Sequence, residues 1–517
     1  MIQTDRAIAL RGQAGPAAGR PQPVVVIGGG FGGLAAAIRL QAAGYQVCLV
    51  EARAQVGGRA YRLAERGFVF DMGPSLITAP YLLDELWAAA GRCRADDLPL
   101  TPLSPYYRIA FQDGSSIDYG AADEAEIARL APDDVAGYRA FMRAIERIYQ
   151  RAFADLAGQP FLTLGSFLRV APELVRLGGA SSVYQFVSRY FRDERLRMAF
   201  SFHPLFIGGN PFRASAIYSI VPYLERLHGV HYALGGMYRV IEAMERLFRE
   251  LGGEVRCGQP VEEILVQGGR AAGVRLAGGS RLPAAAVVAN SDVTTTYLHL
   301  LPPAHRPRST VWRLRRHRYS MSCFLLYLGL NRRYPQLLHH TIVMPRRYRQ
   351  LVTAIFDGAG LPDDLALYLH APTRTDDSMA PPGGESLTIL APVPHLGRGI
   401  DWRTAARPFR DRVVRFLEHE CGLTGLSDSI VVEHQFTPLD FETQLRSWLG
   451  AAFSIEPTLF QSAWFRPHNR AAGVPGLYFV GAGTHPGAGI PGVLLSAAIT
   501  SRLVQADLPA ARLLAES

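Results

Sequence analysis

Two glycine-rich segments carry the residue types that best suit a phosphate-bearing ligand. The first runs Gly28-Gly29-Gly30-Phe31-Gly32-Gly33, and the second extends from Gly481 to Gly492. A glycine turn that leads into a helix exposes backbone N–H groups, and the helix N-terminus favours negative charge. In the first segment Gly28 allows a tight turn, Gly30 lets backbone approach a pyrophosphate, and Gly33 lets the helix pack closely. The spacing predicts a dinucleotide site.

The elements around the first segment match this prediction. The β-branched run Val24–Ile27 predicts a strand, Leu34–Leu40 predicts a helix, and Gln46–Val50 predicts a second strand. Glu51 ends the second strand about twenty residues past the glycines, where an acid can accept hydrogen bonds from a ribose hydroxyl. We therefore expect a Rossmann-type α/β domain.

The next motif in the chain helps to decide which dinucleotide the glycine turn binds. It consists of Gly57, Gly58 and Arg59. An arginine after a flexible glycine pair can reach a pyrophosphate and add a charge-assisted hydrogen bond. The pattern resembles the FAD-binding motif of the flavin amine oxidase and carotenoid desaturase superfamily. The resemblance implies that Gly58 and Arg59 contact FAD phosphates; alternatively, Arg59 is a surface arginine in a loop.

The second glycine segment has a similar setting near the end of the chain. Gly476–Val480 predicts a strand, Gly481–Gly492 a loop and Val493–Val504 a helix. A helix N-terminus near the pyrimidine edge of a flavin stabilises the negative charge of the reduced ring, by about 0.3–2 kcal/mol. We expect Gly481, Gly483, Pro491, Gly492 and Val493 to contact the cofactor; the alternative is a tight connection only.

Composition narrows the class of protein. The chain has 517 residues, 48% of them hydrophobic, which predicts two or three globular domains. Its net charge of +9 suits an anionic membrane surface or nucleic acid, and we favour the membrane because no nucleic-acid motif occurs. The sequence contains no run of about eighteen consecutive apolar residues, so no membrane-spanning helix is predicted. Five scattered cysteines without C-x-x-C spacing indicate a cytoplasmic protein.

The middle of the chain predicts two further regions. Val183, Phe186, Val187, Tyr190 and Phe191 recur at helical spacing, with arginines between them. Such a helix either lies on anionic lipid or buries an ordinary apolar stripe. We divide the chain into a disordered tail (1–22), a discontinuous FAD-binding domain (23–105, 231–300 and 470–510), a helical membrane-facing region (121–230) and a mixed-sheet substrate domain (301–469).

Four segments together resemble signature stretches of bacterial-type phytoene desaturases: Ser201–Phe212, Phe453–Pro457, Gln461–Asn469 and Gly481–Val493. The match extends from about Val24 to Val504. The resemblance implies FAD as cofactor and phytoene, a membrane-dissolved polyene, as substrate. It also implies stepwise C=C formation to neurosporene or lycopene, with quinone or oxygen as terminal electron acceptor, on a protein attached peripherally to the inner membrane.

The sequence does not single out one residue as the catalytic base. His203, Asp71 and Glu456 lie in matching motifs and are candidates, and each could also be structural. His228 and His231 lack a third ligand nearby, so no metal site is expected. Alternatives for the whole chain are oxidation of a hydroxylated or C30 carotenoid, a flavin amine oxidase, and a non-catalytic lipid-binding protein on the same scaffold.

Overall fold

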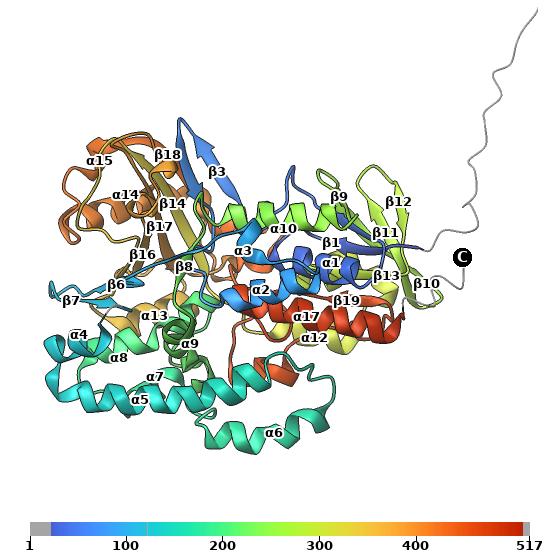
Figure 1. The fold of residues 1–517 in the computed structure, drawn as a ribbon, viewed down its shortest axis with the longest axis horizontal. Helices are drawn as coiled ribbons and strands as arrows, with labels where there is room; N and C mark the ends of the chain where they lie inside the picture. Colours follow the sequence, from blue (N-terminus) through green and yellow to red (C-terminus); the bar gives the residue numbers. More distant parts are fainter. Residues whose placement is uncertain (1–21, 121, 510–517) are drawn as a thin grey trace, which may run out of the picture.

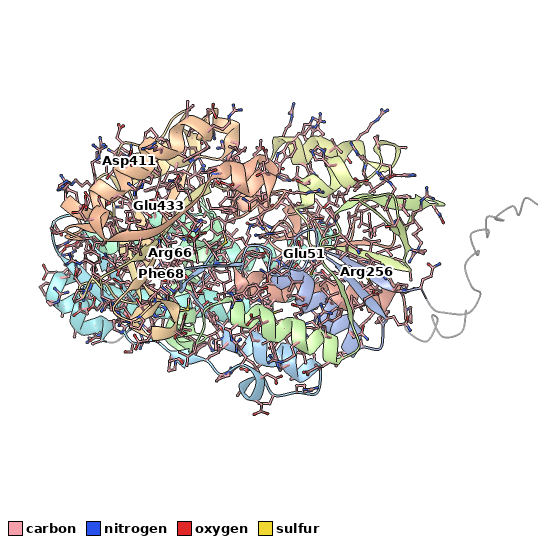
Figure 2. All side chains as sticks on the ribbon, turned by 90° about the horizontal axis from the view of Figure 1, so that it is seen from above. Glu51, Arg66, Phe68, Arg256, Asp411 and Glu433 are labelled. Carbon is pink, nitrogen blue, oxygen red and sulfur yellow. The ribbon has the colours of Figure 1, made fainter. Side chains whose placement is uncertain are left out.

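The computed structural model describes residues 22–120 and 122–509. The tail predicted for residues 1–22 lies outside the described residues, apart from Gln22. Figure 1 shows a parallel sheet in one half of the molecule, a larger mixed sheet in the other, and a layer of helices beneath. Figure 2, seen from above, places Glu51 and Arg256 in the first half and Asp411 and Glu433 in the second.

The parallel sheet has five strands in the order β19-β13-β1-β2-β9. They are β1 (Val24–Ile27), β2 (Val47–Val50), β9 (Glu254–Arg256), β13 (Ala286–Ala289) and β19 (Leu477–Phe479). All residues of β1, β2 and β13 are buried, as expected for parallel strands covered on both faces. The strand predicted at Val24–Ile27 is confirmed. Segments far apart in the chain thus complete one sheet.

Alternate residues of β1 face two different layers. Val24 and Val26 pack against helices, and Val25 and Ile27 pack toward a three-stranded antiparallel sheet. The helices are α1 (Phe31–Ala42), α2 (Pro80–Ala89), α10 (Tyr238–Glu250) and α17 (Ile490–Asp507). The antiparallel strands are β10 (Val261–Gln267), β11 (Arg270–Leu276) and β12 (Arg281–Pro283).

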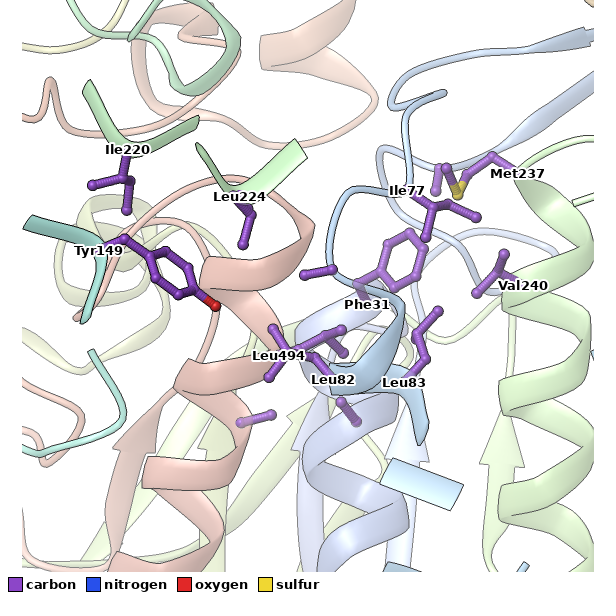
Figure 3. Packing of buried hydrophobic residues seen from close by; sticks show 14 of the residues in the cluster. Phe31, Ile77, Leu82, Leu83, Tyr149, Ile220, Leu224, Met237, Val240 and Leu494 are labelled. Carbon is purple, nitrogen blue, oxygen red and sulfur yellow. The ribbon is translucent and has the colours of Figure 1, made fainter. Parts of the chain in front are cut away.

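The helical layer is closely packed where α1 begins. In Figure 3, Phe31 at the start of α1 lies near Leu82 and Leu83 of α2, with Leu494 of α17 beside them. Leu224, from a more distant helix, belongs to the same cluster. The glycine turn before α1 is therefore held by helices from opposite ends of the chain.

The mixed sheet has seven strands in the order β18-β14-β17-β16-β15-β6-β7. They are β6 (Tyr107–Ala110), β7 (Ser116–Tyr119), β14 (Ser322–Leu330), β15 (His340–Val343), β16 (Leu367–His370), β17 (Glu385–Val393) and β18 (Ile430–Phe436). Only β15 and β6 pair in parallel. Helix α14 (Trp402–His419) packs on one face through Trp402, Phe409 and Val413. The predicted domain ranges assign residues 106–120 to no domain, yet β6 and β7 extend this sheet.

Six α-helices between residues 123 and 228 form the lower layer of Figure 1. They are α4 (Asp123–Leu130), α5 (Val135–Ile148), α6 (Leu164–Arg176), α7 (Val183–Val187), α8 (Glu194–Ser201) and α9 (Val221–His228). The helix predicted through Phe191 is wrong in part, because α7 ends at Val187. The Asp134 carboxylate accepts the backbone N–H groups of Arg192 and Asp193, and this holds the following chain in a turn. Four of the five apolar positions are buried, namely Val183, Phe186, Val187 and Phe191, which fits an ordinary packed stripe.

The remaining elements connect these layers. They are β3 (Arg62–Glu65), β4 (Phe68–Asp71), β5 (Thr101–Pro102), β8 (His231–Tyr232), α3 (Arg94–Asp97), α11 (Val293–Thr295), α12 (Arg308–Arg316), α13 (Tyr348–Asp357), α15 (Leu426–Ser429) and α16 (Pro438–Thr443), with short 3-10 and π turns between them. Among the described residues, none of the helices combines the length and the apolar character needed to cross a membrane.

Candidate functional site

A cavity of about 850 Å³ lies between the two halves of the molecule. One end is formed by the glycine turn after β1 and the first residues of α17. The other end is formed by side chains from the helical layer and the mixed sheet. A polar end and an apolar end are therefore parts of one space.

The glycine turn leaves room where a ligand would lie. Gly28 has φ of +93°, which favours glycine. A Cβ atom on Gly33 would lie 2.0 Å from the Gly28 carbonyl oxygen, so α1 can approach the turn only without a side chain there. A Cβ on Gly30 would lie 3.1 Å from the Asn290 amide nitrogen and 3.9 Å from the Gly58 Cα atom, so only the Asn290 side chain would be in tight contact with it. Gly30 therefore borders the cavity with bare backbone.

Glu51 is buried and fixes the shape of this turn. One carboxylate oxygen accepts the Gly29 N–H at 2.7 Å, and the other accepts the Arg53 N–H at 2.9 Å. The side chain also lines the cavity. Each oxygen retains a free lone pair, so Glu51 can hold the turn and still accept a hydroxyl.

Arg59 brings a positive charge to the same end. Its Nη2 donates to Ser447 Oγ at 2.8 Å, while its buried Nε has no hydrogen-bond partner. Burial lowers the pKa of Arg59, and the nearby Asp292 carboxylate opposes that shift. An arginine keeps its charge under these conditions. A buried, unpartnered N–H beside open glycine backbone suits a diphosphate, so these residues fit FAD.

Hydrogen bonds from two buried side chains hold the second glycine segment in place. Buried Arg466 donates from Nη2 to the carbonyl oxygens of Ala482 and Ile455, at 2.7 and 3.0 Å. The Asn469 amide donates to the His485 carbonyl and to Ser496 Oγ. These two residues, from the Gln461–Asn469 stretch, position the loop that leads into α17. That helix starts at Ile490, so the predicted loop end at Gly492 is wrong by three residues.

Most of the predicted cofactor residues border the cavity. Those that line it are Gly28, Gly30, Glu51, Gly58, Arg59, Gly481, Pro491, Gly492 and Val493. Gly33 and Gly483 do not. A Cβ on Gly483 would lie 2.7 Å from Val293 Cγ1, so Gly483, like Gly33, permits close packing behind the wall. Sequence reasoning missed Asn290, Asp292 and Ser447, which come from separate segments.

None of the three candidate bases lines the cavity. His203 is buried, and burial lowers its pKa to about 3. Burial raises the pKa of Asp71 to about 7, but its carboxylate accepts the Met237 N–H behind the wall. Glu456 is 1% exposed and forms an ion pair with Arg213 at 3.2 Å. Their side chains bond to other protein groups and are not among the residues that line the cavity.

Glu225 of α9 is a carboxylate that does face the cavity. Its Oε2 accepts the Tyr107 hydroxyl at 2.8 Å, and that hydroxyl lies 3.0 Å from His203 Nε2. Its Oε1 is buried without a partner. Burial raises the pKa of Glu225 to about 8, with nearby Asp123 adding to the shift. The other lining carboxylates, Glu51 and Asp292, belong to the glycine end.

The apolar end of the cavity reaches an exposed rim. Lining side chains here include Phe153, Leu156, Phe161, Phe167, Leu174, Leu205, Phe206, Ile217 and Phe465. The rim consists of Leu164, Leu168 and Val175 of α6 together with Leu459 and Phe460, and we call these five residues the apolar rim. Phe460 is 72% exposed, and α6 has no buried residue. Val175, Leu459 and Phe460 also line the cavity.

Comparison with known proteins agrees with this arrangement. The flavin containing amine oxidoreductase family matches residues 31–505. A lycopene-forming phytoene desaturase from Pseudescherichia vulneris is 48% identical over 94% of this chain and 99% of its own. A neurosporene-forming phytoene desaturase from Rhodobacter capsulatus is 42% identical over 93% of each chain.

More distant proteins share the fold. A 4,4'-diapophytoene desaturase from Methylomonas is 34% identical over 93% of this chain and 94% of its own. The solved structure of putrescine oxidase with putrescine aligns with a TM-score of 0.62 at 17% identity, over 94% of this chain and 99% of its own. An oxidoreductase from Methanosarcina mazei aligns with a TM-score of 0.60 at 18% identity, over 92% and 99%.

Proposed function

We propose that this chain, which belongs to the flavin containing amine oxidoreductase family and within it to the phytoene desaturases, introduces C=C bonds stepwise into phytoene. It is an FAD-dependent oxidoreductase acting on CH–CH bonds, and its product is neurosporene or lycopene. The observation that carries the proposal is the single cavity that joins a phosphate-binding turn to an apolar interior.

The glycine end would hold FAD. The backbone around Gly28 and Gly30 receives the diphosphate, Arg59 Nε donates to it, and Glu51 accepts a ribose hydroxyl. Gly481 and the start of α17, with Pro491, Gly492 and Val493, border the same cavity. Bound FAD supplies the oxidising power, since an oxidised flavin accepts a hydride.

The apolar end would hold the hydrocarbon. Phytoene has no polar group, and burying each CH₂ from water contributes about 0.8 kcal/mol, but a substrate that arrives from lipid has already gained this. Its selection therefore depends on shape and packing. The apolar walls also exclude water, which protects the reacting carbons.

Glu225 would accept the proton. Glu225 lines the cavity, its Oε1 is buried without a partner, and Tyr107 donates to the other oxygen. A base works best when its pKa lies near the working pH, and burial brings the pKa of this carboxyl to about 8. His203 positions Tyr107 and stays neutral.

The apolar rim would contact the membrane, and the protein would be cytoplasmic and attached peripherally to the inner membrane. Val175 and Phe460 are exposed and also line the cavity, so the rim lies where the cavity meets the surface. The net charge of +9 favours anionic lipid. A substrate dissolved in the bilayer would enter here without crossing water. Quinone or oxygen would reoxidise the flavin.

The test is desaturation by purified protein supplied with FAD, phytoene in liposomes and either quinone or oxygen. Long-wavelength polyene absorption bands are expected, and their positions report how many bonds form. Without bands in an FAD-loaded sample, a second incubation with a C30 substrate tests the alternative suggested by the Methylomonas relative. Inactivity with both substrates would favour a lipid-binding protein.

A further inference from the structure

Three buried histidines form a cluster behind the cavity wall, in the mixed sheet. His340 of β15 and His370 of β16 are cross-strand partners, and His339 directly precedes His340. One ring nitrogen of each lies within 4.8 Å of the other two, and all three side chains are buried. We propose that His339, His340 and His370 bind a divalent transition metal ion of the zinc type.

The hydrogen bonds within the cluster leave a donor or acceptor unused. His339 Nε2 and His370 Nε2 face each other at 3.2 Å and share one hydrogen bond. His340 Nε2 is buried and has no partner. A buried polar atom without a partner costs about 1–3 kcal/mol. A metal ion would bind His340 Nε2 and would replace the proton shared by His339 Nε2 and His370 Nε2.

The other ring nitrogen, Nδ1, of His339 and of His340 is hydrogen-bonded to a hydroxyl oxygen. His339 Nδ1 lies 2.6 Å from Thr375 Oγ1, and His340 Nδ1 lies 2.8 Å from the Tyr368 hydroxyl. When Nδ1 donates to oxygen, Nε2 carries the lone pair that a metal needs. The Asp376 carboxylate lies near His339 and favours positive charge there.

Binding of a zinc-type ion requires the His340 ring to move a short distance toward His339 and His370. Zinc–nitrogen bonds are about 2.0–2.1 Å, which holds tetrahedral nitrogens about 3.3 Å apart. The His339 and His370 nitrogens already stand at 3.2 Å, so the His340 ring must approach them. Water would take the fourth position. The ion would join β15 to β16 and steady Tyr368, whose hydroxyl also bonds Ser75 at the cavity wall.

The test uses FAD-loaded protein purified without a histidine tag and treated with a chelator. Titration with Co²⁺ is expected to give one tight equivalent with visible ligand-field bands, and one equivalent of Zn²⁺ is expected to abolish them. His340→Gln and His370→Gln should lose this equivalent. His419→Gln, at an exposed position in α14, should keep it.

A gentler variant tests the oxygen partner. Tyr368→Phe removes the hydroxyl that orients His340 and should weaken cobalt binding by about 10–100-fold. Flavin content reports whether each variant is folded. Failure of the folded wild-type protein to bind one equivalent would overturn the proposal, and so would unchanged binding in folded His340→Gln. Neither result depends on turnover, so the outcome is separate from that of the desaturation test.

Discussion

The two ends of the cavity are constructed in opposite ways. At the glycine end the surface is mostly backbone, presented by turns that leave β1 and β19 and enter α1 and α17. At the apolar end the surface consists of side chains from helices and short segments that are far apart in the chain. The first end should therefore tolerate almost no added atoms, whereas the second should tolerate changes of shape but not of charge.

Gly30→Val breaks the glycine end most severely. The first added carbon makes a tight contact with the Asn290 amide, and the rest of the side chain then occupies the proposed place of the diphosphate. We expect complete loss of bound flavin, measured as the ratio of flavin to protein after release. Gly360→Ala is the matched control, because open space surrounds Gly360. A Gly30→Val protein that purifies with stoichiometric flavin would contradict the cofactor placement.

Glu225→Gln tests the one acid that faces the apolar end. Turnover should fall by about 10²–10⁴-fold with flavin content unchanged, because the amide cannot accept the proton. The rate of the wild-type enzyme should rise as pH passes through about 8, where Glu225 ionises. Equal pH–rate profiles for the two proteins would exclude Glu225 as the base.

The stability of the protein provides a second measurement on Glu225. Its folded pKa of about 8 lies above the ordinary value of 4.5, so its neutral form stabilises the fold at low pH. This contribution is complete below about pH 4.5 and is lost as pH rises to about 8. The Tm of the wild-type protein should therefore decline relative to that of Glu225→Gln across this range.

Arg59→Met removes charge from the glycine end but leaves its backbone intact. A charge-assisted hydrogen bond contributes about 1.5–3 kcal/mol, so FAD should bind about 10–100-fold more weakly. Titration of apoprotein with FAD measures the change. Arg403→Met, at an exposed position, should bind FAD as the wild type does. An unchanged Kd for Arg59→Met would place the diphosphate elsewhere.

Phe460→Asp perturbs only the outer edge of the apolar end. Phe460 is largely exposed, so folding should be unaffected, while binding to anionic vesicles should weaken about tenfold. Cosedimentation measures this. Leu234→Asp alters an exposed leucine outside the apolar rim and should change vesicle binding little. Equal losses in both variants would show that the rim has no special role.

The sequence predicts the glycine end well because its signals are local. The strand at Val24–Ile27 has the predicted bounds, since its β-branched residues and the glycines that follow mark it. The helix predicted through Phe191 is too long, because helical spacing does not reveal that Asp134, distant in the chain, accepts the backbone N–H groups of Arg192 and Asp193 and holds this segment out of the helix. Tertiary contacts overrode periodicity there.

The apolar end was harder to predict because its residues meet only in the folded chain. Glu225 has the sequence surroundings of a surface acid, and nothing local indicates that α9 buries it beside Tyr107. The pair His228 and His231 drew attention as a metal motif, but His228 bonds the Tyr149 hydroxyl. The cluster of His339, His340 and His370 depends on the pairing of β15 with β16.

The order of strands in the parallel sheet also bears on how the protein is made. β19 pairs with β13, and the helix that follows it lines the cofactor cavity, although both come from the last part of the chain. A nascent polypeptide on the ribosome therefore has its first glycine turn long before it has the opposite wall. With FAD bound as proposed, the cofactor can be enclosed only after synthesis is almost complete, so cofactor retention should distinguish finished chains from truncated ones.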